Sequence, residues 1–302
     1  MTSIMFRGFK YFVLFAVVIT MTCGNSPLQA NSVKRDANQA MIALYNFHFQ
    51  VSDSIIRRME KNFPEHYMPH LMRAQYYWWQ IISNDLDLLQ QGNYRASLVK
   101  AESLAKELVK TKNYNYNDVF QFINLYALKA RIELLNSEYL RALRHMRNSV
   151  EFLELSIGRE NIHPDFYLTS GLYNYMAEYG SRRYPFLMVY ALFYPRGDMQ
   201  KGLEQLKLAA YNSNIVIKTE AHYFLMKIFF ELEQDFSQAL QHAAWLVAEY
   251  PENLIYLYHY HEILLLLEKN ELAAEIRKDF FELLNDNIQL NFSQRKYFGG
   301  LL

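Results

Sequence analysis

The chain is poor in residues that interrupt helices and in the residue that forms covalent cross-links. Its 302 residues include one cysteine, seven prolines and ten glycines. A single cysteine excludes an internal disulfide and any metal site built from several thiolates. The scarcity of proline and glycine, together with long segments rich in leucine, alanine, glutamate and lysine, predicts a nearly all-α protein.

The chain also lacks net charge and the motifs of common enzymes. Thirty-one basic residues balance 31 acidic ones, and no basic stripe is present, so nucleic-acid binding has no electrostatic support. No glycine-rich phosphate loop, GxSxG turn or HExxH motif occurs. We therefore expect a protein that is not an enzyme and that uses no cofactor.

The N-terminus has the layout of a secretory signal. Arg7 and Lys10 precede an apolar run over 11–22, which is followed by the polar sequence CGNSPLQA. Residues 1–30 are expected to be a signal peptide cleaved after Ala30, leaving 31–302 as one helical repeat domain whose first residues, 31–36, are frayed. Lipidation of Cys23 is the alternative. The protein is thus expected to be exported, either periplasmic or, if Cys23 is acylated, an outer-membrane lipoprotein whose membrane contact is that lipid anchor.

Residues 220–253 contain the most regular pattern of the chain. Tyr223, Met226 and Phe230 recur at three- and four-residue spacing, which places them on one face of an α-helix. The polar residues 233–235 then predict a tight turn before a second helix.

The second helix carries small residues one turn apart. Ala239 and Ala243 form a smooth patch against which another helix can pack closely, and Pro251 predicts that the helix ends near Glu249 or Tyr250. This pattern resembles the tetratricopeptide repeat, from which Lys227 departs because that position is usually small. The resemblance implies an all-α fold, an α-solenoid of antiparallel helix pairs that binds another protein.

Other segments repeat the spacing. Ser52 precedes Pro64 by twelve residues, as Ala239 precedes Pro251, and Ala273 follows Ala239 by 34, which is the period of the family. A superhelix of about six pairs is therefore expected, with a helix break at 91–93. Its close crossings would be made by Ser52, Ala74, Ala142, Gly202, Ala239 and Ala273. The block from Ser170 to Ala210 also looks like the middle of the tetratricopeptide-39 group, which implies an interaction protein.

The resemblance also implies where a partner would bind. The concave face of such a solenoid is formed by first-helix residues that point away from the second helix, with two arginines nearby. In this sequence the candidate partner-binding residues are Leu71, Gln75, Trp78, Arg182, Arg183, Phe224, Ile228, Glu231, Tyr258, Glu262 and Leu265. The Lys/Asn clamp for a C-terminal carboxylate is absent from these positions, so capture of an acidic C-terminus is not expected. A groove of Trp78 and Tyr258 with Arg182 and Arg183 nearby suits an apolar or aromatic peptide.

Two other functions are compatible with the sequence, and a metal site is not expected. The chain has 24 Tyr, 21 Phe and 3 Trp. Aromatic rings stack on sugars, so one alternative is a glycan-binding module, and the other interpretation of these rings is burial in the core. A helical-barrel hydrolase is supported only by acidic side chains. No metal is expected, because His259 and His261 lie about 200° apart around a helix and His66 is separated from His70 by Pro69.

Overall fold

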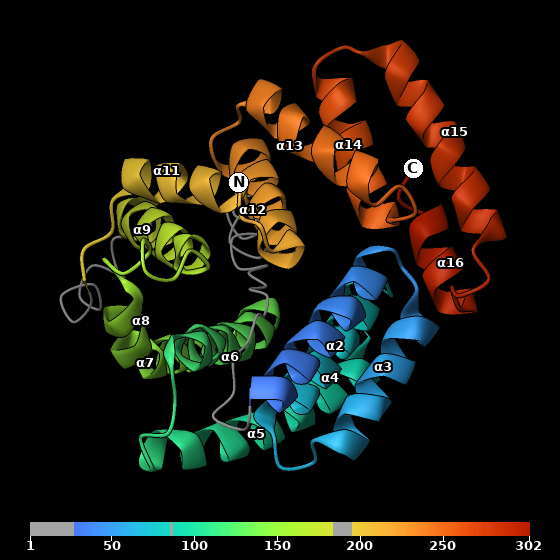
Figure 1. The fold of residues 1–302 in the computed structure, drawn as a ribbon. Coiled ribbons are helices and arrows are strands. Elements are labelled where there is room, and N and C mark those ends of the chain that lie inside the picture. Colours follow the sequence, from blue (N-terminus) through green and yellow to red (C-terminus); the bar gives the residue numbers. More distant parts are fainter. Residues whose placement is uncertain (1–26, 85–86, 184–194) are drawn as a thin grey trace. The chain divides into compact units, whose positions relative to one another are not determined.

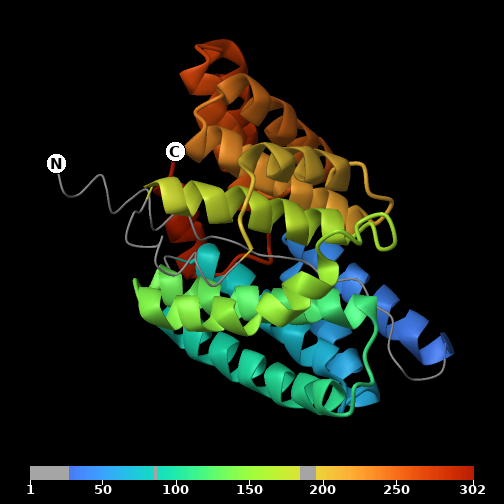
Figure 2. The ribbon, with the colours of Figure 1, turned by 90° about the vertical axis from the view of Figure 1, so that its left-hand side faces the viewer.

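The structure is a computed structural model that describes residues 27–84, 87–183 and 195–302, with side chains from Ser32 onward. The described residues form α-helices and one π-helical segment and contain no strand (Figure 1, Figure 2). The all-α expectation is therefore confirmed. Most of the expected signal peptide, including Cys23, lies outside the described residues. In the part that is described, no helix is both long enough and apolar enough to cross a membrane.

The chain divides into two compact units. The middle unit comprises the described residues of 109–225 together with 27–31, and the terminal unit comprises the described residues of 32–108 and 226–302. The terminal unit holds most of α2 (Pro27–Tyr45) and α5 (Leu88–Lys110), and all of α3 (Phe49–Asn62), α4 (Tyr67–Ile82), α13 (Phe236–Glu249), α14 (Leu254–Leu266), α15 (Asn270–Asp286) and α16 (Phe292–Gly299). The middle unit holds α6 (Tyr116–Leu135), α7 (Tyr139–Asn148), α8 (Val150–Ser156), α9 (Phe166–Arg183) and α11 (Met199–Ala209). Helix α12 (Ile215–Lys227) continues into the π-helical segment Ile228–Leu232.

In the terminal unit, helices from the two ends of the sequence share one core. The rings of Tyr45 and Tyr250 lie 5.2 Å apart, and Trp79 meets Tyr256 edge-on at 6.2 Å. The buried Asn253 side chain donates from Nδ2 to the carbonyl of Tyr45 at 2.8 Å. Aromatic and hydrogen-bonding contacts thus join segments about two hundred residues apart in sequence.

The middle unit is organised around a close crossing of α9 and α11. A Cβ atom built on Gly202 would lie 2.5 Å from the backbone nitrogen of Tyr175 and 2.8 Å from the carbonyl oxygen of Gly171. Beside this crossing, Asn174 Nδ2 donates to Gln205 Oε1 at 2.7 Å, and Gln205 Nε2 donates to Glu160 Oε1 at 3.0 Å. All three side chains are buried, so a chain of polar contacts crosses the interior.

The small residues expected at close crossings are buried. Each of the six is shielded from solvent: Ser52, Ala74, Ala142, Gly202, Ala239 and Ala273. The turn at 233–235 and the end of α13 before Pro251 also lie where the sequence predicts them. The helix pairing inferred from these positions is therefore consistent with the observed packing.

Two local expectations are wrong. Residues 31–36 belong to α2 rather than to a frayed end, and Asp36 at the end of this stretch is buried and pairs with Arg58 at 3.2 Å. Gly92 does not break a helix, because α5 already begins at Leu88. Asp87 caps that start by accepting from the backbone nitrogen of Leu89 at 2.8 Å, which supplies the helix-initiating signal upstream of the glycine.

A candidate binding groove on helices α3, α4 and α5

An open groove of about 700 Å³ lies over α4 and is walled by α3 and α5, all within the terminal unit. Each helix contributes one polar stripe at helical spacing. The lining residues are Asp53, Arg57 and Glu60 from α3, His70, Arg73, Tyr76, Tyr77 and Gln80 from α4, and Gln90, Asn93, Ala96, Ser97 and Lys100 from α5. All of these side chains are partly or fully exposed, so the surface is accessible.

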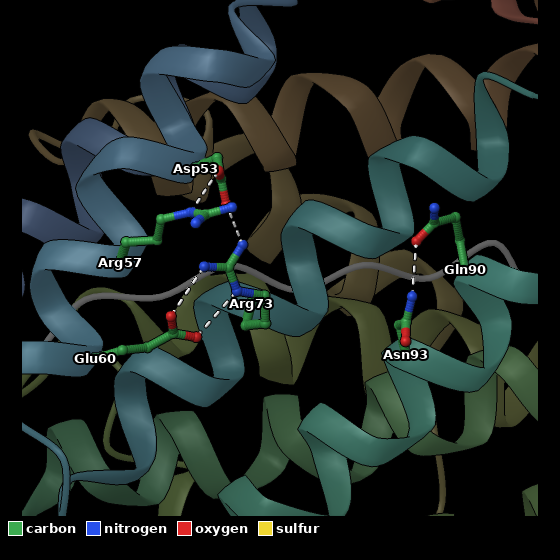
Figure 3. A network of polar contacts seen from close by, with 6 residues as sticks. All are labelled: Asp53, Arg57, Glu60, Arg73, Gln90 and Asn93. Carbon is green, nitrogen blue, oxygen red and sulfur yellow. Dashed lines mark hydrogen bonds and ion pairs between the residues drawn. The ribbon is translucent and has the colours of Figure 1, made fainter.

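Arg73 is the organising residue of the groove (Figure 3). Its Nε and Nη2 donate to the two carboxylate oxygens of Glu60 at 3.0 and 2.9 Å, and its Nη1 donates to Asp53 Oδ1 at 2.5 Å. Asp53 Oδ2 accepts from Arg57 Nε at 2.8 Å. The planar guanidinium therefore holds two carboxylates at fixed positions, which is the geometry that arginine provides better than lysine.

The electrostatics of the network agree with its geometry. Burial opposes the charge of Asp53, but hydrogen bonds from Arg73 and Arg57 outweigh burial and lower the pKa of this carboxyl group. Burial also opposes the charge of Arg73, and the hydrogen bonds to Glu60 and Asp53 again outweigh it and raise its pKa. Asp53 and Arg73 are therefore both charged at neutral pH, and the ion pair between them links α3 to α4.

Two tyrosines extend the network along α4. The guanidinium carbon of Arg73 lies 5.5 Å from the ring centre of Tyr76 and 6.0 Å from that of Tyr77, within cation–π range. Burial and the charge of Asp53 raise the pKa of Tyr76, so its hydroxyl is protonated and can donate. Arg73 is thus contacted by two aromatic rings as well as by two carboxylates.

The two ends of the groove differ in chemistry. At one end Asn93 Nδ2 donates to Gln90 Oε1 at 3.2 Å, and Gln80 Oε1 accepts from Gln294 Nε2 at 3.4 Å. At the other end lie His70 and Lys100. Burial first, and then the positive charges of Lys100 and Arg73, lower the pKa of His70 despite the opposing effects of Glu60 and the Pro64 carbonyl. His70 is therefore neutral at pH 7.

Five of the eleven candidates expected on the concave face are buried. Leu71, Gln75 and Trp78 are on the side of α4 away from the groove, and Trp78, 1% exposed, packs against Tyr94 at 5.8 Å. Phe224 and Ile228 are also buried. Other parts of the chain already cover these five side chains.

The remaining candidates are at least partly accessible and belong to both units. Arg182 and Arg183, at the end of α9, belong to the middle unit, and the other four belong to the terminal unit. Arg182 pairs with Glu178 on its own helix. In the terminal unit, Glu231 pairs with Lys227, and burial raises the pKa of Glu231 although Lys227 opposes this effect. Tyr258 and Glu262 are half-buried and Leu265 is 44% exposed.

The groove is not among the sequence-based expectations, because those expectations place the partner-binding residues of α4 on the neighbouring face of the helix. Residues 70, 73, 77 and 80 are polar or aromatic at three- and four-residue spacing, and Asp53, Arg57 and Glu60 repeat that spacing on α3. This shared polar periodicity was the available signal. Across 27–84, 87–183 and 195–302, no three His, Cys, Asp or Glu side chains gather as a metal site requires. No protein-family model, no curated protein and no solved structure matches the chain.

Proposed function

We propose that this protein is a non-catalytic helical scaffold that binds a segment of another polypeptide in the groove of α3, α4 and α5. The observation that carries the proposal is the ordered Arg73 network at the floor of an accessible groove. Side chains that are fixed before binding lose little conformational freedom when a ligand arrives. The groove volume is within the range of about 300–1,000 Å³ typical of ligand sites.

A polypeptide ligand fits the lining. Gln80, Gln90 and Asn93 each carry both a donor and an acceptor, and an extended chain presents alternating N–H and C=O groups to such side chains. The tyrosine hydroxyls of Tyr76 and Tyr77 add further donors at the centre of the groove. No glycine-rich or nucleophilic motif accompanies them in the sequence. This combination supports recognition rather than catalysis.

The proposal includes the wider architecture and the location. We infer that the helix pairs belong to a tetratricopeptide-like solenoid, an inference supported by the buried small residues and by the 34-residue spacing of Ala239 and Ala273. The basic and apolar N-terminal pattern supports export to the cell envelope, with Cys23 as the alternative lipidation site. The mass of the mature chain isolated from the envelope tests that part directly.

The binding proposal is tested with a reporter at the rim of the groove. An environment-sensitive fluorophore is attached to A96C in a chain that also carries C23S, and the labelled chain is titrated with a pool of random-sequence hexapeptides. We expect a saturable signal, and a much weaker one when Y77A removes a central ring and hydroxyl. The matched control places the fluorophore on V99C, because Val99 is exposed on the same helix but does not line the groove.

A parallel titration separates the glycan alternative. The same labelled chain is exposed to pools of neutral oligosaccharides in place of peptides. A response to sugars with none to peptides would replace the polypeptide ligand by a glycan. Equal responses from the two label positions would show that the groove is not the site.

A further inference from the structure

The groove has a length that sets the size of its ligand. It runs along α4 from His70 to Gln80, and a rise of about 1.5 Å per helical residue makes this span about 15 Å. An extended chain advances about 3.3 Å per residue. If the groove is filled from end to end, it therefore accommodates four to five residues.

The groove also has an uncompensated charge at one end. Among the described residues, the ion pairs of the groove join Arg57 and Arg73 to Asp53 and Glu60 and leave Lys100 without a carboxylate partner. Lys100 is exposed and can move toward a ligand. Its neighbour His70 is neutral at pH 7, so Lys100 supplies the excess positive charge at that end.

The other end of the groove carries no net charge. Gln80, Gln90 and Asn93 line it and offer amide groups only. These amides suit the backbone of a ligand and do not select its side chains by charge. Selection by charge is thus confined to the end at Lys100.

We propose that the groove recognises an acidic peptide segment, four to five residues in extended conformation, with an aspartate or glutamate side chain paired to Lys100. This inference rests on the proposed function and adds the chemical class of the ligand and the place of its acidic side chain in the groove. The amide side chains bind the peptide backbone at the far end, and Arg73 remains occupied by its own carboxylates. Lys100 therefore selects the ligand by charge and does not stabilise the folded chain.

The test compares ligand charge and groove charge together. Three pools of blocked hexapeptides are prepared, random at five positions and fixed at the sixth as Glu, Gln or Lys. Binding is measured with the A96C reporter on the full chain carrying C23S. An exposed ion pair contributes about 0.2–1 kcal/mol, so we expect the Glu pool to bind up to about fivefold more tightly than the Gln pool, with the Lys pool weakest.

Variants of Lys100 decide the origin of this preference. K100Q is expected to make the Glu and Gln pools bind equally, and K100E to reverse the order so that the Lys pool binds best. K106Q is the matched control, because Lys106 is an exposed lysine on the same helix that pairs with Glu102 and does not line the groove. Because Lys100 is exposed, these variants are expected to keep the thermal unfolding temperature of the parent chain.

The outcomes separate this inference from the function on which it rests. Equal binding of all three pools, or a Glu preference that survives in K100Q, would overturn the acidic-segment proposal while leaving peptide binding intact. Failure of every pool to change the fluorescence would overturn both.

Discussion

The two units achieve close helix packing in different ways. In the terminal unit the small residues at the expected helix crossings are alanines and a serine, set within aromatic and aliphatic side chains: Ser52, Ala74, Ala239, Ala243 and Ala273. In the middle unit the closest approach uses Gly202 against the backbone of α9 and adds the buried contacts of Asn174, Gln205 and Glu160. The first arrangement tolerates a methyl group at the crossing, and the second does not.

This difference has a consequence for how each unit responds to mutation. Apolar packing weakens in proportion to the atoms removed. A glycine contact between backbones fails as soon as one atom is added, and a buried polar chain fails when one member is lost, because the partners remain buried. We therefore expect the largest single-residue effects in the middle unit.

The substitution G202A is expected to have the largest effect. The new Cβ would meet backbone atoms of Tyr175 and Gly171, which cannot rotate away, so α9 and α11 must separate. We expect a loss of about 3 kcal/mol in the free energy of unfolding, at the upper end for overpacking. Urea denaturation measures the loss, and hydrogen exchange should localise it to α9 and α11. The comparison fails if G202A unfolds at the same urea concentration as the parent chain.

Replacing Gln205 by methionine tests how much the buried polar contacts contribute to the stability of the middle unit. The substitution Q205M keeps the approximate side-chain length but leaves the amide of Asn174 and the carboxylate of Glu160 without this partner. A loss of about 2–3 kcal/mol is expected from the denaturation midpoint. The additional change N174L should recover part of that loss, since replacing both partners of a buried hydrogen bond is less harmful than replacing one. A double variant less stable than Q205M would show that the contact is not the source of the effect.

The sequence predicts these features unequally. Features set by local helical spacing agree with the prediction. Examples are the burial of Ala239 and Ala273 and the end of α13 before Pro251. The contact of Asn174 with Gln205 spans 31 residues, and that of Gln205 with Glu160 spans 45. No local pattern indicates which polar side chains meet across such separations.

The groove illustrates the same limit. Periodicity shows that α4 has distinct faces, but it does not show which face the rest of the chain covers. The sequence predicts Trp78 on an open surface, yet this ring is buried against Tyr94, while Arg73 and Tyr77 are accessible. The helix break expected at 91–93 would also separate Gln90 from the rest of the groove-lining residues of α5, but the cap at Asp87 places both Gln90 and Asn93 within that helix.

Among the helix caps of the terminal unit, Asn253 is expected to contribute most to the free energy of unfolding. Its Oδ1 accepts from the backbone nitrogens of Ile255 and Tyr256, and its Nδ2 donates to the Tyr45 carbonyl. N253A is expected to lower the free energy of unfolding by about 2 kcal/mol, from the lost cap and the lost hydrogen bond. N253D keeps the cap acceptor and should fall between the two. The exposed cap Asn291 is the control, and N291A should cost less, because water can replace its hydrogen bonds.

Acid is expected to weaken the terminal unit through two of its histidines. Burial lowers the pKa of His66 to about 4 and that of His259 well below its usual range. A histidine with a pKa lower in the folded state stabilises the fold above pH 6.5 and loses that contribution as the pH falls below 6.5, by at most about 1.4 kcal/mol per pH unit. For His66 the loss extends down to about pH 4.

The variant H66N tests this pH dependence. His66 caps α4 by accepting from the backbone nitrogen of Met68, and asparagine can accept in its place without titrating. Denaturation midpoints at pH 7.5, 6 and 5 should fall less steeply in H66N than in the parent chain. Parallel curves for the two proteins would mean that folding does not hold His66 in its neutral form.

The smallest expected effect is a gain in stability from G92A, in contrast to the loss expected from G202A. Gly92 lies inside α5, and a Cβ added there would have no neighbouring atom within 4 Å, in contrast to the crowded site at Gly202. G92A should therefore raise the free energy of unfolding by about 0.5–1 kcal/mol, because alanine loses less backbone freedom in a helix. The same glycine-to-alanine change would then have opposite signs in the two units. A loss of stability in G92A would instead indicate that the helix break predicted at 91–93 is present in solution.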